Sequence, residues 1–124
     1  MKLLLDSHVL LWWLERNPRL SDTHRAFLEG PEHVVYASSV SVAELQIKAA
    51  LGKLGIPDEP LGVVIAEEGL EELEFRSDHG DVLRALPPIH RDPFDRMLIA
   101  QALVEDCVLV TADAAIRQYG VPTV

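Results

Sequence analysis

Short apolar runs alternate along this chain with longer segments in which apolar residues recur every three or four positions. Unbroken apolar runs are typical of strands that a sheet buries on both faces. They predict strands over residues 2–5, 34–37 and 108–110, with a further edge strand at 121–124. Residues 71–75 alternate polar and apolar positions, with Leu73 and Phe75 facing inward, and predict another strand.

The segments with helical spacing lie between these runs, and most end at glycine or proline. They predict helices over residues 9–14, 21–28, 38–51, 60–68, 78–86, 93–104 and 113–119. Residues 52–62 form the one linker-like stretch, which is short enough to be a loop between helices. Strands that alternate with helices predict a three-layer α/β/α domain with a mostly parallel central sheet. At 124 residues, the chain is expected to form a single domain over residues 1–124.

The charge balance and the cysteine content of the chain argue against some classes of function. The chain has 20 acidic and 11 basic residues, a formal net charge of −9, which argues against coating nucleic acid with a basic face. Such an excess of acids suits a carboxylate metal site equally well. The single cysteine, Cys107, excludes an intrachain disulfide framework and is expected to be an inert core thiol. Asp6 and His8 interrupt the N-terminal apolar run, so we expect no signal peptide, no membrane contact and a cytoplasmic protein.

Four acids fall near predicted strand ends and helix starts. Asp6 ends the first strand and Asp113 follows the last, while Glu44 and Asp95 lie in the early turns of two helices. Ligands of parallel α/β sheets bind at the carboxyl ends of the strands. We therefore expect these four carboxylates to converge there.

Each acid also has a structural explanation. Glu44 fits a capping box with Ser41, and Asp113 fits a helix N-cap. Asp92 before Pro93 is a good N-cap, which leaves Asp95 as a favourable charge near a helix N-terminus. Capping is the simpler explanation for any single acid and a weaker one for all of them at one edge.

Electrostatics favours a cation at such a cluster. Two carboxylates about 4 Å apart repel by about 4 kcal/mol at an effective dielectric constant near 20. No lysine or arginine is placed in the sequence to neutralise all four acids, although Arg91 and Arg96 could approach. Oxygen-only ligands select Mg²⁺ or Mn²⁺, and such a site activates water against a phosphodiester. The pattern therefore predicts metal-assisted hydrolysis.

Four stretches together resemble PIN-domain proteins over essentially the whole chain, and most of all the VapC-type ribonuclease toxins of bacterial toxin–antitoxin pairs. They are LLLDSHVLLWWL, SSVSVAELQIKAALGKL, HRDPFDRMLIAQAL and LVTADAAIRQYGV. The HRDPFDRMLIAQA run is the most specific of them.

The resemblance implies a metal-dependent endoribonuclease whose catalytic and metal-binding acids are Asp6, Glu44, Asp95 and Asp113. Asp6 and Asp95 would hold Mg²⁺ or Mn²⁺ most directly, and the other two would complete the site or position the water. Asp92 is either an N-cap or a further residue facing the metal. The implied partners are an RNA substrate, a small antitoxin that packs over the early helices, and a second copy of the chain in a homodimer.

Several residues that lie near these acids in the sequence can be explained in two ways. Ser7 and Thr111 either donate hydrogen bonds to the site or cap turns, and Arg96 is expected to be structural.

We expect His8 and His90 to be surface side chains. Trp12 and Trp13 diverge by about 100° on a helix, so one should enter the core while the other faces a partner.

Two alternatives stay open. A PIN-like domain can act as a non-catalytic partner-binding module. Asp6 can also be a nucleophile for phosphoryl transfer, although His8 then occupies the position where such enzymes commonly place a second aspartate.

Overall fold

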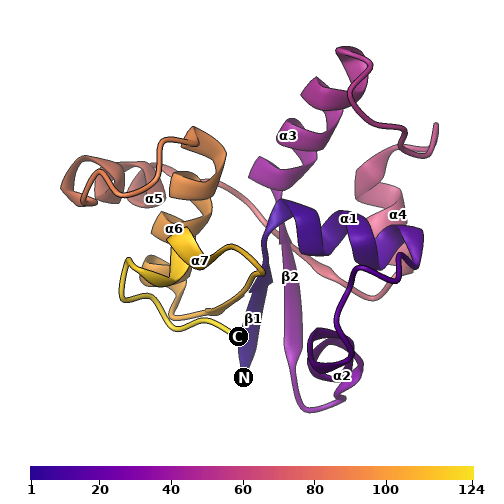
Figure 1. The fold of residues 1–124 in the computed structure, drawn as a ribbon, viewed down its shortest axis with the longest axis horizontal. Helices are drawn as coiled ribbons and strands as arrows, with labels where there is room; N and C mark the ends of the chain where they lie inside the picture. Colours follow the sequence, from indigo (N-terminus) through magenta and orange to yellow (C-terminus); the bar gives the residue numbers. More distant parts are fainter.

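A computed structural model describes all residues 1–124 and contains one parallel sheet (Figure 1). Its strands lie in the order β3-β2-β1-β4. Their bounds are β1 Lys2–Leu5, β2 Val34–Ser38, β3 Glu71–Leu73 and β4 Val108–Val110. Because the chain adds β2 and β3 on one side of β1 and then β4 on the other, the strand order reverses beside β1. Ligands bind at this kind of switch point in open parallel sheets.

The register between β1 and β4 aligns their carboxyl ends. Leu3 pairs with Val108 and Leu5 with Val110, and the Asp6 N–H donates to the Val110 carbonyl at 3.0 Å. The residues that follow the two strands, Asp6 and Thr111, therefore meet at one edge of the sheet.

Seven α-helices and one 3₁₀ turn connect the strands. They are α1 Ser7–Glu15, α2 Asp22–Glu29, α3 Ser39–Ala50, α4 Leu61–Glu67, α5 Ser77–Val82, η1 Leu83–Ala85, α6 Pro93–Glu105 and α7 Ala114–Arg117. The sequence-based helices are all present, but the one expected over 78–86 divides into α5 and η1. Since Pro87 disfavours helical backbone at the residue before it, this segment ends at Leu86. Residues 121–124 make one parallel bridge, Leu109 to Thr123.

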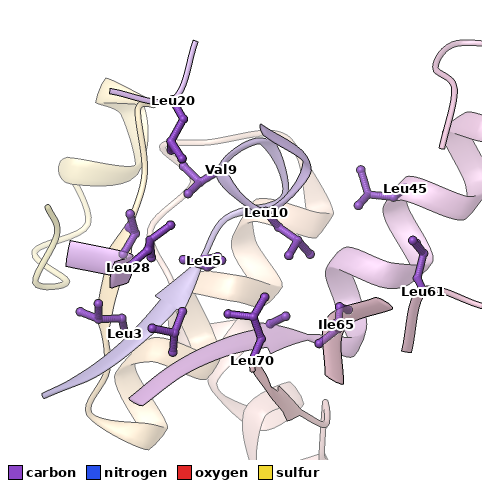
Figure 2. Close-up of a cluster of buried hydrophobic side chains, with 13 residues drawn as sticks. Leu3, Leu5, Val9, Leu10, Leu20, Leu28, Leu45, Leu61, Ile65 and Leu70 are labelled. Atoms are coloured by element: carbon purple, nitrogen blue, oxygen red, sulfur yellow. The ribbon is translucent and has the colours of Figure 1, made fainter. Parts of the chain in front are cut away.

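The side chains of β1 alternate between two cores. Leu3 and Leu5 pack with Leu10 of α1, Leu28 of α2 and Ile65 of α4 (Figure 2). Strand side chains alternate between the faces of a sheet, so the intervening Leu4 points the other way.

The second core covers that opposite face. Leu4 packs there with Leu98 and Ile99 of α6 and with Ile116 of α7. Both faces of the sheet are thus covered by helices, and the expected three-layer α/β/α architecture is confirmed.

A buried polar side chain ties α6 to two strands. The Ser38 hydroxyl donates to Gln101 Oε1 at 2.5 Å, and Gln101 Nε2 donates to the carbonyls of Leu73 and Glu74. Gln101 is fully buried, so these bonds satisfy groups that would otherwise destabilise the core.

The two tryptophans depart from expectation. Trp12 and Trp13 are both partly buried against the first core, so neither is fully internal or fully exposed. The guanidinium of Arg16 lies over the Trp13 ring, 5.1 Å from its centre, in a cation–π contact.

Two further features concern the cysteine and the helices. Cys107 is buried, and burial raises the pKa of its thiol, as expected for an inert core residue. No helix combines the length and the apolar composition that crossing a bilayer requires.

We expect Leu4→Ala to lower the free energy of unfolding by about 2–5 kcal/mol, because it opens a cavity in the second core. Leu51→Ala is the matched control, since Leu51 is 64% exposed at the end of α3. Urea denaturation of both variants measures the difference. Equal effects of the two substitutions would contradict the assignment of Leu4 to the core.

Candidate carboxylate site

Asp6 lies at the switch point and is 3% exposed. Its Oδ1 accepts the Val9 N–H at 2.8 Å, which caps α1, and its Oδ2 accepts from Thr111 Oγ1 at 2.5 Å. The Thr111 oxygen itself accepts the Asp113 N–H at 3.0 Å, so its proton is free to point at Asp6. Two strand ends thus fix this carboxylate.

Glu44 reaches the same edge from α3 and is 2% exposed. Its Oε2 pairs with Lys48 Nζ at 2.6 Å, whereas its Oε1 is buried without a hydrogen-bond partner. The expectation that no lysine neutralises these acids is therefore wrong for Glu44, whereas no lysine or arginine forms an ion pair with Asp6, Asp95 or Asp113. Lys48 lies one helical turn after Glu44, the spacing at which oppositely charged side chains meet.

The capping-box explanation for Glu44 is also wrong. Helix α3 begins at Ser39, and its N-cap is Ser38, whose hydroxyl accepts the Val40 N–H. The Ser41 hydroxyl instead accepts a hydrogen bond from Ser7 Oγ at 2.9 Å. Glu44 therefore lies beyond the reach of a cap, and Ser7 bridges α1 to α3 without contacting an acid.

Two acids lie near the start of α6, and the sequence left open which of them caps the helix. Asp92 is the N-cap and accepts the Phe94 N–H at 2.8 Å. Asp95 does not cap the helix, and its Oδ2 lies 3.0 Å from His90 Nε2.

Asp113 combines capping with a contact in the site. Its Oδ1 accepts the Ala115 N–H and caps α7, while its Oδ2 lies 3.0 Å from His90 Nε2.

His90 is the residue that sequence reasoning missed, since it was expected at the surface. Its side chain is only 18% exposed, and its Nδ1 accepts the Asp92 N–H at 3.1 Å. Because Nδ1 is an acceptor, the proton of the neutral ring lies on Nε2, which faces Asp95 and Asp113. The sequence did contain one indication of this role. His90 lies two residues before the N-cap Asp92, a position from which a ring nitrogen can accept the N–H of the cap residue.

Burial and neighbouring charges shift the pKa values of the acids in this site. Burial is the main cause that raises the pKa of Asp95 to about 6; the charges of Asp92, Glu44 and Asp6 act in the same direction, and His90 opposes them. Burial also raises the pKa of Asp6. Charge repulsion among acids from β1, α3 and α6 is the expected consequence of convergence at one edge.

The hydrogen bond to His90 acts in the opposite direction on Asp113. Burial opposes ionisation of that carboxyl, but the His90 and Ala115 hydrogen bonds outweigh it and lower the Asp113 pKa. Burial likewise opposes the charged form of His90, and its contacts with Asp113 and Asp95 outweigh it and raise the His90 pKa.

The donor set fits a hard divalent cation. One oxygen of Glu44 is buried without a partner, and Asp95 resists ionisation in the absence of a positive charge. Ligand atoms of His90, Asp95 and Asp113 lie within 4.8 Å of one another, a spacing that a bound ion can bridge. Carboxylate oxygens are the ligands that Mg²⁺ and Mn²⁺ prefer.

Arg96 has the structural role expected of it. Its guanidinium donates to the carbonyls of Pro87, Leu83 and Leu86 and to the hydroxyl of Tyr119. The same Tyr119 oxygen accepts the His90 N–H at 2.7 Å. Arg96 thus holds the loop that carries His90 and contacts no carboxylate of the site.

Comparisons with known proteins agree with this architecture. The family model described as PIN domain matches residues 3–122. No curated protein matches the chain. Among solved structures, VapBC2 from Rickettsia felis bound to a DNA fragment from its promoter matches with a TM-score of 0.75 and 16% identity, covering 100% of this chain and 98% of that one.

Two further structures match with slightly lower scores. FitAcB from Neisseria gonorrhoeae has a TM-score of 0.66 and 18% identity, covering 98% of this chain and 95% of that one. FitAB bound to an IR36 DNA fragment has a TM-score of 0.65 and 18% identity, covering 98% and 93%. At such identities these similarities concern the fold.

We expect Lys48→Met to lower the free energy of unfolding of the metal-free protein by about 1–3 kcal/mol, because it leaves the buried Glu44 carboxylate unpaired. Adding Glu44→Gln should recover most of the loss, since no buried charge then remains. Lys53→Met is the control, because Lys53 is exposed. Urea denaturation of the single and double variants tests this coupling, and additive effects would contradict it.

The Asp95 pKa of about 6 lies above the value of about 3.9 for an unfolded chain, so ionised Asp95 opposes folding at higher pH. We expect Asp95→Asn to raise the free energy of unfolding by about 1–2 kcal/mol near pH 7.5, less than the full linkage value because Asp95 is partly exposed. The gain should shrink as the pH falls and vanish below about pH 4. Urea denaturation in a chelator at several pH values tests this, and a gain independent of pH would contradict it.

Proposed function

The chain belongs to the PIN domain family, and from this premise we propose that it is a metal-dependent endoribonuclease, the toxin component of a toxin–antitoxin pair. The observation that carries the proposal is the meeting of acids from β1, α3, α6 and the β4–α7 turn. One of them, Glu44, keeps a buried carboxylate oxygen without a partner. The similarity in fold to VapBC2 and FitAB supports the toxin assignment.

The four acids would have different roles in binding a cation. Asp6 and Asp95 would hold Mg²⁺ or Mn²⁺ most directly, and Glu44 and Asp113 would complete the site or position the attacking water. A bound divalent cation supplies Lewis acidity, which polarises the phosphodiester and neutralises its developing charge.

The surrounding residues hold this arrangement in place. Thr111 orients the Asp6 carboxylate through its hydroxyl, and His90 keeps the carboxylates of Asp95 and Asp113 side by side through Nε2. Lys48 offsets the charge of Glu44. Acids that are already held at fixed distances do not have to reorganise when substrate binds, which lowers the free-energy cost of the reaction.

The proposed protein partners follow from the same assignment. An antitoxin would pack over the early helices, and a second copy would form a homodimer. Apolar side chains at the surface of α3 and α4, Ile47, Leu51 and Val63, are 48–64% exposed and supply area for such contacts.

The first test is a calorimetric titration with Mn²⁺. We expect saturable binding by the natural protein and its loss in Asp6→Asn and Asp95→Asn, because each substitution removes a negatively charged ligand and keeps the shape of the side chain. Asp58→Asn is the control, since Asp58 is an exposed loop residue.

RNA cleavage is then measured with the same proteins. The two site variants should lose about 100-fold or more of the rate while their circular dichroism is unchanged, and Asp58→Asn should cleave normally. If Mn²⁺ does not bind, or if the site variants cleave as fast as the natural protein, the nuclease proposal fails. A folded protein that binds an antitoxin and cleaves no RNA would then be a partner-binding module.

A further inference from the structure

A cavity of about 290 Å³ opens beside the carboxylates. Its lining consists of Asp6, His8, Trp12, Ala112 and Asp113. Two of these residues, Asp6 and Asp113, also belong to the acid cluster. Whatever occupies the cavity therefore lies in direct reach of the candidate site.

Two aromatic rings of α1 form one wall of this cavity. His8 and Trp12 are one helical turn apart, and their ring centres are 6.0 Å apart with planes inclined by 36°. His8 is exposed and Trp12 is partly exposed, so both rings are accessible to a ligand. None of the hydrogen bonds of Asp6 or Asp113 involves either ring, so neither ring is held in place by a hydrogen bond to these acids.

The charge of the chain indicates what kind of contact can hold a nucleic acid here. A formal net charge of −9, with acids in the cavity itself, gives phosphate groups little attraction. Stacking of a base on an aromatic ring needs no opposite charge and tolerates any base sequence. The volume lies just below the usual range of small-molecule sites, about 300–1,000 Å³, which suits a single planar ring system.

We propose that His8 and Trp12 form a stacking subsite for one unpaired nucleobase of an RNA strand, next to the bond to be cleaved. This inference rests on the proposed nuclease function. The subsite requires an unpaired base, because a base within a duplex is not free to enter the cavity.

Binding is tested apart from cleavage by tryptophan fluorescence in the presence of a chelator. The chain has two tryptophans, so Trp13→Phe leaves Trp12 as the sole reporter and Trp12→Phe leaves Trp13. An unstructured hexaribonucleotide should quench the fluorescence of Trp13→Phe and leave that of Trp12→Phe unchanged. A hexamer with abasic sugars should quench neither. Quenching should also change little between about 50 and 200 mM salt, because stacking is not a phosphate contact.

Kinetics of the metal-loaded protein give the second readout. Trp12→Ala should raise KM for the hexamer about 5- to 50-fold with little change in kcat, and Trp12→Phe should restore most of the loss. Because Trp12 also packs against the core, His8→Ala serves as a second variant with no effect on folding, and it should raise KM by about 2- to 5-fold.

The results separate this inference from the nuclease proposal. Cleavage with an unchanged KM in both Trp12→Ala and His8→Ala, or equal quenching by the abasic hexamer, overturns the subsite and leaves the nuclease intact. Base-dependent quenching of Trp12 without cleavage of any RNA supports the subsite and refutes the nuclease.

Discussion

The parallel pairing of β1 with β4 is the constraint on which the candidate site depends. It aligns Leu5 with Val110, so the next residues, Asp6 and Thr111, reach the carboxyl edge together. Strands β2 and β3 lie on the other side of β1, which leaves this edge as the switch point of the sheet. The starts of α1 and α7 then bring the Asp6 cap and the Asp113 cap to the same place.

Packing carboxylates together opposes folding, and the structure compensates locally. Lys48 pairs with Glu44, Thr111 donates to Asp6, and His90 contacts Asp95 and Asp113. These contacts do not fully offset burial and charge repulsion, so the pKa of Asp95 stays near 6. A site that keeps such unrelieved charge is stabilised by any ligand that brings positive charge, and residues with strongly shifted pKa values concentrate at functional sites for this reason.

The same excess of acids limits how the chain can bind a polyanion such as RNA. Long-range attraction is weak for a chain of this charge, so affinity has to come from short-range contacts near the site. Trp12 and His8 are the aromatic side chains that line a cavity together with Asp6 and Asp113. Helix α1 therefore contributes to the site twice, through its cap residue and through the rings of its first two turns.

Patterns in the sequence were enough to predict the architecture and the edge of the sheet at which the four acids lie. Apolar runs and helical spacing depend on local periodicity, and the rule for parallel sheets places strand ends at one edge, so the long elements were predicted within a few residues. Short elements were less well predicted: η1 and the shortened β3 depend on how the 74–92 segment packs against α6, which local patterns do not encode.

The contacts of each acid could not be predicted in this way, because they depend on the folded chain. The Glu44–Lys48 pair has a local spacing, but capping by Ser41 is equally local, and the observed start of α3 at Ser39 excludes it. His90 meets Asp113 across 23 residues and Thr111 meets Asp6 across 105. Contacts over such separations depend on strand order and register, which follow from the free energy of the whole core and not from any one segment.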